Sequence, residues 1–304
     1  MRIHEQHTES ERYEFLKSII RERISSALTR VKPRTLQRIM KESVYGGKMI
    51  RPIVTMLSCS AVGGKESDAI DAATAIELLH TSSLIHDDIM DDSPLRRGLP
   101  TIHTTHGIPM AILAGDTFIA LAFQSLQSIG GVNKERIHHA FTDSFRHVCE
   151  GQGYDLCLSL DNCAEDDAHS LMVEKKTAKL MQSATEIGAL IGTSNQEHIQ
   201  ALSYYGYTLG MAFQAQDDLL DAIGDEELMG KPVLVDVKNG RSTYVTSDAV
   251  TVATSDNRAD AIHATKCLVQ NYTREACWSL DRLPQCEANE MLRMLAESLM
   301  KREA

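Results

Sequence analysis

Apolar residues recur at the three- and four-residue spacing of helices along nearly the whole chain. The clearest runs stand near the start, in the middle and in the last third: Leu16, Ile19, Ile20 and Ile24; Ile76, Leu79 and Leu84; Leu202, Tyr205, Leu209 and Ala212. The alternation of apolar and polar residues that would indicate strands is scarce, and the one sizeable β-branched stretch covers residues 244–254. The pattern therefore predicts an all-α protein.

Short breaks divide this pattern into segments, and none of them is long enough to be a linker. They contain glycine or proline, as at Gly46-Gly47, Gly63-Gly64 and Gly130-Gly131. The chain has no low-complexity segment and no repeat of about 20 to 50 residues. We therefore expect residues 1–304 to form a single domain, a bundle of ten or more helices.

Composition narrows the possible partners and locations. The chain has 42 acidic and 31 basic residues, a formal charge of −11, which excludes the basic surface that a nucleic-acid partner needs. No uninterrupted apolar run approaches the roughly 18 to 20 residues of a membrane span. The polar residues 1–14 do not resemble a secretory signal, and the seven scattered cysteines fit reduced thiols. We expect a cytoplasmic protein without a stable membrane anchor.

The first motif with chemical meaning is an Asp-Asp-x-x-Asp cluster that ends a helical pattern beginning near residue 69. It consists of Asp87, Asp88 and Asp91. At about 100° per residue, Asp87 and Asp91 share one helix face with His80, two turns earlier. Oxygen ligands at this spacing suit Mg²⁺, which usually takes its remaining ligands from water and substrate phosphates.

A second cluster has the same spacing. It consists of Asp217, Asp218 and Asp221, with Gln214 one turn before it on the same face. One such cluster is more often a solvated helix end, but two of identical spacing, each preceded by an apolar helix, indicate a cation site between two helices.

Basic residues near glycine and proline could bind the anions that such cations accompany. Lys48 and Arg51 follow the pair Gly46-Gly47, where the backbone can approach an anion closely. Arg96 and Arg97 follow the first cluster on a turn after Pro94 and could reach a metal-bound phosphate. Further candidates are Lys175-Lys176-Thr177 and Gly230-Lys231-Pro232.

Together these segments resemble the motif series of the trans-isoprenyl diphosphate synthases. The matching segments occur in the order of that family: Gly46-Gly47-Lys48-Met49-Ile50-Arg51-Pro52, residues 84–91 with Arg96-Arg97-Gly98, Glu150-Gly151-Gln152, Lys176-Thr177, residues 213–221 and Gly230-Lys231-Pro232. The resemblance implies the all-α isoprenoid synthase fold, with a central cavity between the two Asp-bearing helices, in a homodimer. It also implies head-to-tail condensation of an allylic diphosphate with isopentenyl diphosphate.

The resemblance also implies the roles of individual residues. Three Mg²⁺ ions would be held by the clusters Asp87, Asp88, Asp91, Asp217 and Asp221. The allylic diphosphate would be bound by Arg96, Lys176 and Lys231, and isopentenyl diphosphate by Lys48, Arg51, His80 and Arg97. Thr177 and Gln214 would lie beside the allylic cation.

The last quarter departs from the family pattern. Arg241 stands where the family usually has lysine, so it keeps the charge with a different geometry and we expect a weaker ligand. Val245 replaces the family's proline, and the chain beyond Tyr244 is interpreted from composition alone.

Side chains before the first cluster bear on product length. If the growing tail runs back along this helix, Ser82 and Ser83 lie in the first turn and Leu79 in the second, with no aromatic residue to block the path. One turn is about 5.4 Å, similar to one five-carbon unit, so we expect products of C20 or longer. Phe118, in the following helix, could still close the cavity.

Three other functions fit parts of the sequence. A farnesyl diphosphate synthase would make a shorter product. A terpene cyclase has no use for the second basic group of Lys48, Arg51 and Arg97. A non-catalytic partner subunit of a heteromeric synthase should have lost aspartates from the clusters, and both clusters are complete.

Overall fold

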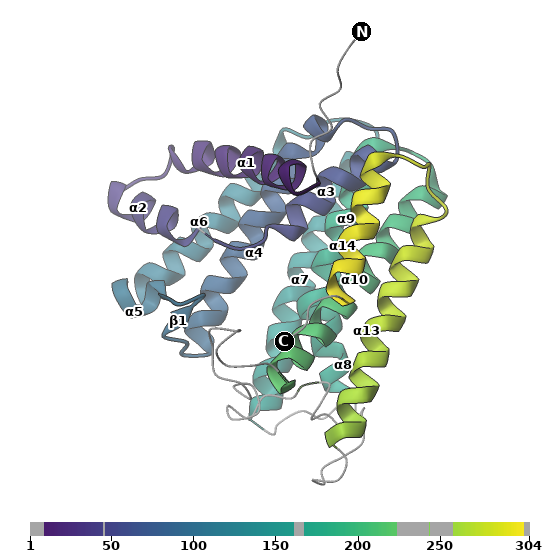
Figure 1. Ribbon diagram of the computed structural model, residues 1–304. Coiled ribbons are helices and arrows are strands. Elements are labelled where there is room, and N and C mark those ends of the chain that lie inside the picture. The colour runs from purple at the N-terminus through teal and green to yellow at the C-terminus, as the bar shows by residue number, and fades with distance from the viewer. Residues whose placement is uncertain (1–8, 45, 161–166, 224–242, 244–257, 301–304) are drawn as a thin grey trace.

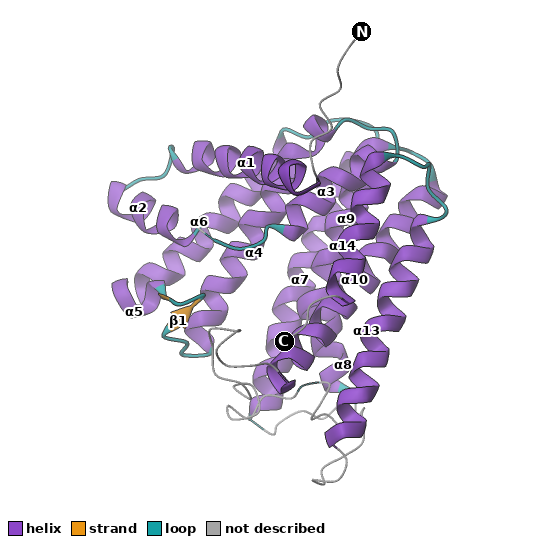
Figure 2. Cartoon of the chain, viewed as in Figure 1, coloured by secondary structure: helices purple, strands orange, loops and turns teal. Residues whose placement is uncertain are grey.

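The computed structural model describes residues 9–44, 46–160, 167–223, 243 and 258–300, and more than ten helices build this part of the chain (Figure 1). The α-helices are α1 Glu9–Leu28, α2 Arg34–Ser43, α3 Ile50–Ala61, α4 Ile70–Met90, α5 Ile102–His106, α6 Ile108–Gln127, α7 Lys134–Ser159, α8 Ala168–Val173, α9 Lys179–Gly192, α10 Gln196–Ile223, α13 Arg258–Leu280 and α14 Glu287–Met300. The remaining elements are the 3₁₀ turn η1 Glu66–Ala69, the π-helical turn η2 Glu174–Ala178 and the strands β1 Leu95–Arg96 and β2 Leu99–Pro100. Figure 2 shows that these two short strands are the only strands among the described residues, so the all-α prediction is confirmed.

The helices that carry the acidic clusters lie at the centre of the bundle. Helix α4 packs along α6, whereas α9 lies against α3, α7 and α10, and α13 covers α10. In Figure 1 the C-terminal ends of α4 and α10 both point to the lower end of the molecule. The Asp clusters, which end these two helices, are therefore placed on the same side of the bundle.

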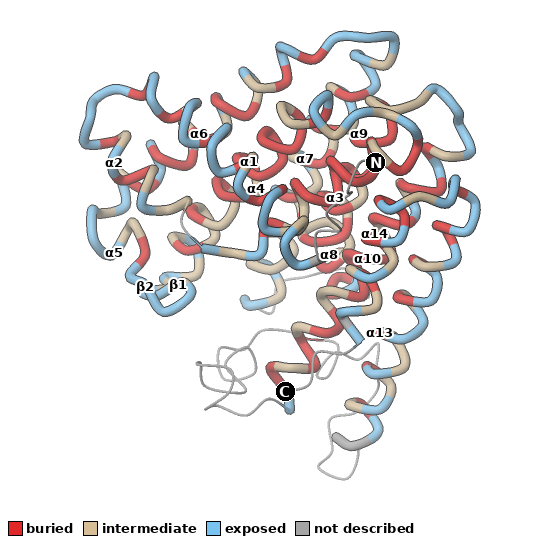
Figure 3. Tube along the Cα trace, turned by 45° about the horizontal axis from the view of Figure 1, so that its top comes forward, coloured by how far each residue is buried: buried red, intermediate tan, exposed pale blue. Residues whose placement is uncertain are grey.

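The apolar core explains why these helices form. Figure 3 shows buried residues concentrated in α3, α4, α9 and α10, and the main core extends from α1 to α14. Small residues allow close helix packing: a Cβ on Gly206 of α10 would lie 2.6 Å from the carbonyl oxygen of Met181 in α9. Because real Cβ atoms do not come that close, the contact between α9 and α10 requires glycine at this position.

A tight hairpin follows α4 and meets the loop before α3. Strand β1 pairs antiparallel with β2, and Arg97 (φ 54°) and Gly98 (φ 74°) form the two-residue turn between them. Positive φ at both positions is typical of a type I′ turn. Gly47 also has positive φ (82°), and a Cβ there would lie 2.7 Å from Nη1 of Arg97. The guanidinium therefore rests on the glycine backbone, which brings the hairpin to the loop of Lys48.

Helix α6 differs from the expectation about apolar segments. By length and composition it could cross a membrane, with a mean hydropathy of 1.4 and 33% of its apolar window buried. Polar residues interrupt its apolar run, but Asp116 is its single charged residue, so the mean hydropathy of the helix stays high. Because α6 packs along α4, one of its faces belongs to the helical core.

Several predictions concern residues outside the described part of the chain. These are Lys231, Arg241 and the segment 244–254. Their proposed roles stay predictions.

Candidate active site

A cavity of about 830 Å³ lies between α4, α10 and the segments that carry the basic residues. Its wall includes most of the residues predicted from the sequence: Lys48, Arg51, His80, Ser83, Asp87, Asp91, Arg96, Arg97, Lys176, Thr177, Gln214 and Asp217. Five further predicted residues lie outside this wall: Leu79, Ser82, Asp88, Phe118 and Asp221. The structure thus brings the carboxylates of Asp87, Asp91 and Asp217 into one cavity with two sets of basic residues. The first set is Arg96 and Lys176, and the second is Lys48, Arg51 and Arg97.

The first acidic cluster lies at the end of α4. The helix ends at Met90, and the backbone N–H of Asp91 donates to the carbonyl of Asp87 over 2.8 Å. Burial raises the pKa of Asp87 to about 6; the carboxylates of Asp91 and Asp155 add to this effect, whereas Lys176 opposes it. A carboxylate in this position gains stability from any cation placed beside it.

Asp88 points to the hairpin instead of the cavity. Its Oδ1 accepts a hydrogen bond of 2.6 Å from Nε of Arg96. Burial raises the pKa of Asp88, and the Arg96 guanidinium opposes that rise. The sequence predicted that Asp88 would support a metal and that Arg96 would bind a diphosphate. In this structure the two residues bind each other and tie the hairpin to α4.

Lys176 reaches the first acidic cluster from the π-helical turn η2. Its Nζ lies 2.6 Å from Oδ2 of Asp155 on α7 and 3.9 Å from Oδ2 of Asp87. Asp155 therefore holds the ammonium group next to Asp87. Sequence reasoning missed Asp155, although it follows Gly151 by one helical turn and could have been noticed as an acidic residue on that face.

Thr177 and Gln214 form a hydrogen-bonded chain toward the second cluster. The Thr177 hydroxyl donates to Oε1 of Gln214 over 2.9 Å, and the Gln214 amide donates to Oδ1 of Asp218 over 2.8 Å. This chain links η2 to α10 across the cavity wall. It fixes the orientation of the Gln214 amide, whose rotamer would otherwise be free.

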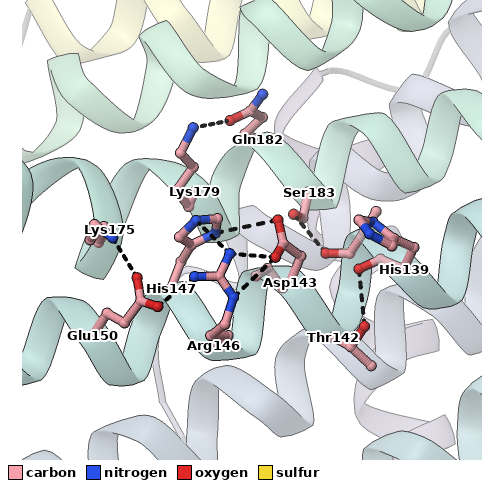
Figure 4. Close-up of polar contacts among 12 residues, drawn as sticks. His139, Thr142, Asp143, Arg146, His147, Glu150, Lys175, Lys179, Gln182 and Ser183 are labelled. Atoms are coloured by element: carbon pink, nitrogen blue, oxygen red, sulfur yellow. Dashed lines mark hydrogen bonds and ion pairs between the residues drawn. The ribbon is translucent and has the colours of Figure 1, made fainter.

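The π-helical turn is held against α7 by a surface network and by a close backbone contact. Figure 4 shows Glu150 accepting from both Lys175 and Arg146, and Arg146 also pairs with Asp143. The pairs of Arg146 lie in solvent, which screens them, so they add little to stability; the pair of Lys175 with Glu150 is partly buried. The backbone contact is more restrictive, because a Cβ on Gly151 would lie 2.3 Å from the backbone nitrogen of Lys176. Gly151 thus lets η2 approach α7 closely enough for Lys176 to reach Asp155.

A second basic group lines the same cavity from α3, the loop before it and the hairpin turn. Nη1 of Arg51 is 3.3 Å from Nε2 of His80, and Arg97 and Lys48 line the same region. Burial lowers the pKa of Arg51, against the raising effect of Glu77 and Asp217. Burial, together with the neighbouring guanidinium groups, lowers the pKa of His80 well below its ordinary value, so the imidazole is neutral near pH 7.

These two groups make the cavity suitable for two polyanions. A polyprenyl synthetase family model matches residues 33–276, most of the chain. The chain belongs to this family. The short chain isoprenyl diphosphate synthase of Methanothermobacter thermautotrophicus is 38% identical over 310 residues, covering 93% of this chain and 95% of that protein.

Two solved structures have the same fold. The geranylgeranyl pyrophosphate synthetase of Pyrococcus horikoshii has a TM-score of 0.89 and 32% identity, covering 96% of this chain and all of that one. The polyprenyl synthase of Caulobacter crescentus, complexed with calcium and isoprenyl diphosphate, has a TM-score of 0.82 and 26% identity, with 96% of both chains covered. The predicted resemblance to trans-isoprenyl diphosphate synthases is confirmed.

In this polyprenyl synthetase, the residues predicted to set chain length fall into two groups. Ser83 lines the cavity, one position before Leu84, which also lines it. Ser82 and Leu79 are buried on another face of α4, and Phe118 is buried in α6. The Ser82 hydroxyl makes no hydrogen bond with the described residues. The cavity as it stands therefore reaches Ser83 but not Ser82.

Proposed function

We propose that the protein joins an allylic diphosphate to isopentenyl diphosphate, head to tail and with Mg²⁺, to form an all-trans polyprenyl diphosphate. One observation carries this proposal: two separate basic groups line a single cavity together with carboxylates from α4 and α10. One diphosphate would need only one such group. Two groups support a condensation of two diphosphates and disfavour the terpene cyclase alternative.

The carboxylates fit a metal that is shared with substrate. Among the described residues, no three acidic, His or Cys side chains converge closely enough to hold an ion alone. Mg²⁺ commonly takes one or two protein carboxylates and completes its shell with water and phosphate oxygens. Asp87, Asp91 and Asp217 would supply the protein ligands, with Asp88 and Asp221 behind them, and we propose three ions. When bound, these ions would stabilise the negative charge of the leaving diphosphate.

The protein's own groups would do the remaining work on the first substrate. Lys176, placed by Asp155, would bind the leaving diphosphate, and Arg96 could join it by exchanging Asp88 for phosphate. Oxygen atoms of Thr177 and Gln214 would then face the carbocation. The aromatic ring of Phe213, which lines the same wall, could also stabilise that charge.

Lys48, Arg51 and Arg97 would hold the second diphosphate. This anchoring places the double bond of isopentenyl diphosphate near the allylic carbon before water reaches it. A new carbon–carbon bond forms, and one proton must then leave the adjacent carbon. We assign the proton to the departed diphosphate, since no side chain of the cavity is singled out as a base.

We propose a product of C20 or longer. No aromatic residue stands in the turn before Asp87, where Ser82 and Ser83 lie. The Pyrococcus horikoshii protein carries the name geranylgeranyl pyrophosphate synthetase, which is a C20 product. A farnesyl product would require a closer floor, such as Phe118.

We further propose that a second copy of the chain covers α6. Ile108, Ile112 and Leu113 are 51%, 44% and 53% exposed on this apolar helix. Exposed apolar side chains grouped on one helix are typical of an interface, and a symmetric dimer buries the same patch on both copies. An Ile112→Glu variant should run as a monomer in size-exclusion chromatography with light scattering. A dimer of unchanged stability would refute this interface.

The test of function is an incubation with farnesyl diphosphate, labelled isopentenyl diphosphate and Mg²⁺. An elongated labelled diphosphate supports the proposal. Hydrocarbon without label indicates a cyclase, and no turnover indicates a partner subunit. Asp87→Ala should lower kcat at least about a hundredfold without unfolding the protein. Activity within about tenfold of the parent, equivalent to about 1.4 kcal/mol, would refute the metal assignment.

A further inference from the structure

One carboxylate in the cavity has no part in the mechanism above. Glu77 comes from the middle of α4, one turn before His80, and lines the cavity beside it. It is only 8% exposed, and its Oε2 atom has no hydrogen-bond partner among the described residues. A buried carboxylate oxygen without a donor is costly, because nothing replaces its lost hydration. The cavity thus contains an acceptor that lacks a partner in the part of the chain that the structure describes.

Charged and titratable groups face Glu77 from several elements. Arg51 comes from α3, Arg97 from the hairpin turn and His80 from the next turn of α4, and Asp217 of α10 acts on Arg51. Burial raises the pKa of Glu77 to about 7, although Arg51 and Arg97 lower it. Near neutral pH, this carboxyl therefore changes readily between its charged and neutral forms.

A diphosphate bound by Arg51 and Arg97 would bring several negative charges close to this carboxyl. One unit charge about 5 Å away, at an effective dielectric constant of about 20, shifts a protonation equilibrium more than about a hundredfold. Protonating a group of pKa about 7 at pH 8 requires a factor of only about 10. Glu77 therefore takes up a proton when the diphosphate binds, and the repulsion between the two negative charges is removed. The resulting neutral carboxyl can also donate its O–H to a phosphate oxygen.

We propose that Glu77 is a substrate-binding residue that takes one proton from water as isopentenyl diphosphate binds and donates this O–H to the diphosphate. The inference rests on the proposed function, because it uses the assignment of Arg51 and Arg97 to the second diphosphate. The proton returns to water when the pocket empties. Binding of this substrate is thus coupled to proton uptake by a single side chain.

Titration calorimetry tests this coupling directly. Isopentenyl diphosphate alone is titrated at pH 8 in two buffers with different heats of ionisation, which gives the number of protons taken up. The parent should take up close to one proton more than Glu77→Gln. The matched control is Glu186→Gln, a partly buried glutamate outside the cavity that accepts from Ser203, and it should behave like the parent.

The outcomes separate the two proposals. Binding with equal proton uptake in the parent and Glu77→Gln overturns the role of Glu77 and leaves the proposed function intact. A parent that does not bind isopentenyl diphosphate overturns the proposed function itself. If Glu77→Gln did not fold, the parent alone would decide, because an uptake near zero at pH 8 refutes the coupling.

Steady-state kinetics give a second readout. The KM of the parent for isopentenyl diphosphate should rise close to tenfold between pH 8 and pH 9, because an increasing share of free enzyme must gain a proton. The KM of Glu77→Gln for isopentenyl diphosphate should stay nearly constant over this pH range, since the amide N–H of glutamine can donate without first taking up a proton. The KM for the allylic substrate should show the same pH dependence in the parent and in Glu77→Gln. A KM for isopentenyl diphosphate with the same pH dependence in both proteins overturns the inference.

Discussion

Replacing Glu77 by glutamine should make the folded protein more stable at alkaline pH. Burial raises the pKa of this carboxyl from 4.5 to about 7, so the folded protein keeps a proton that the unfolded chain releases. The free energy of unfolding therefore falls as pH rises through this window, and the stabilising effect of the neutral carboxyl is lost above pH 7. Glutamine imitates the neutral form at every pH. Because the pKa rises from 4.5 to about 7, the variant should gain about 3 kcal/mol at pH 8 and less than about 1 kcal/mol at pH 5.

Urea unfolding followed by circular dichroism, at pH 5 and pH 8, measures this gain without any substrate. The parent and Glu77→Gln should show the same m-value, so that a change in midpoint reports stability alone. Glu186→Gln serves again as the control and should show no pH-dependent gain. A Glu77→Gln variant that is no more stable than the parent at pH 8 would mean that Arg51 and Arg97 keep the Glu77 carboxyl charged at little cost.

Three further substitutions test the cavity. Gly47→Ala should raise the KM for isopentenyl diphosphate at least about tenfold, because the backbone has positive φ and the new methyl group would displace the hairpin guanidinium; an unchanged KM would contradict the contact. Asp155→Asn should lower kcat at least about tenfold by releasing Lys176, and a kcat within about threefold would show that the lysine needs no support. Ser83→Phe, on the cavity wall, should shorten the product seen by chromatography. If Ser82→Phe shortened it instead, the tail would run into the interior of the bundle beside α4.

Local periodicity was enough to predict the acidic clusters. Asp87 and Asp91 both face the cavity because a separation of four residues returns a helix to nearly the same direction. The same rule places His80 on that face. A turn after Pro94 was also predicted, and the structure shows a hairpin there with Arg97 and Gly98 as its two turn residues. These residues depend on neighbours in the sequence, so the sequence is sufficient to place them.

The remaining features depend on contacts between distant segments. Asp155 and Lys176 are 21 residues apart, and their ion pair exists only because α7 and η2 pack closely at Gly151. Glu77 looks like an ordinary polar residue in an apolar helix until α3 and the hairpin close over it. The pairing of Asp88 with Arg96 likewise depends on how the hairpin folds back. No spacing rule along one helix contains this information.

The π-helical turn η2 also limits where the chain can tolerate the insertion or deletion of a residue. Lys175 pairs with Glu150, whereas Lys176 lines the cavity and pairs with Asp155, so adjacent and chemically identical side chains have different partners. Each residue advances a helix by about 100°, and α8, η2 and α9 follow one another without a break. Deleting one codon between Ala168 and Glu174 would therefore rotate α8 against η2 and α9, and would turn its buried side chains His169 and Met172 away from the core although neither was mutated. We expect natural insertions and deletions to avoid α8, η2 and α9 and to occur in the loops around them.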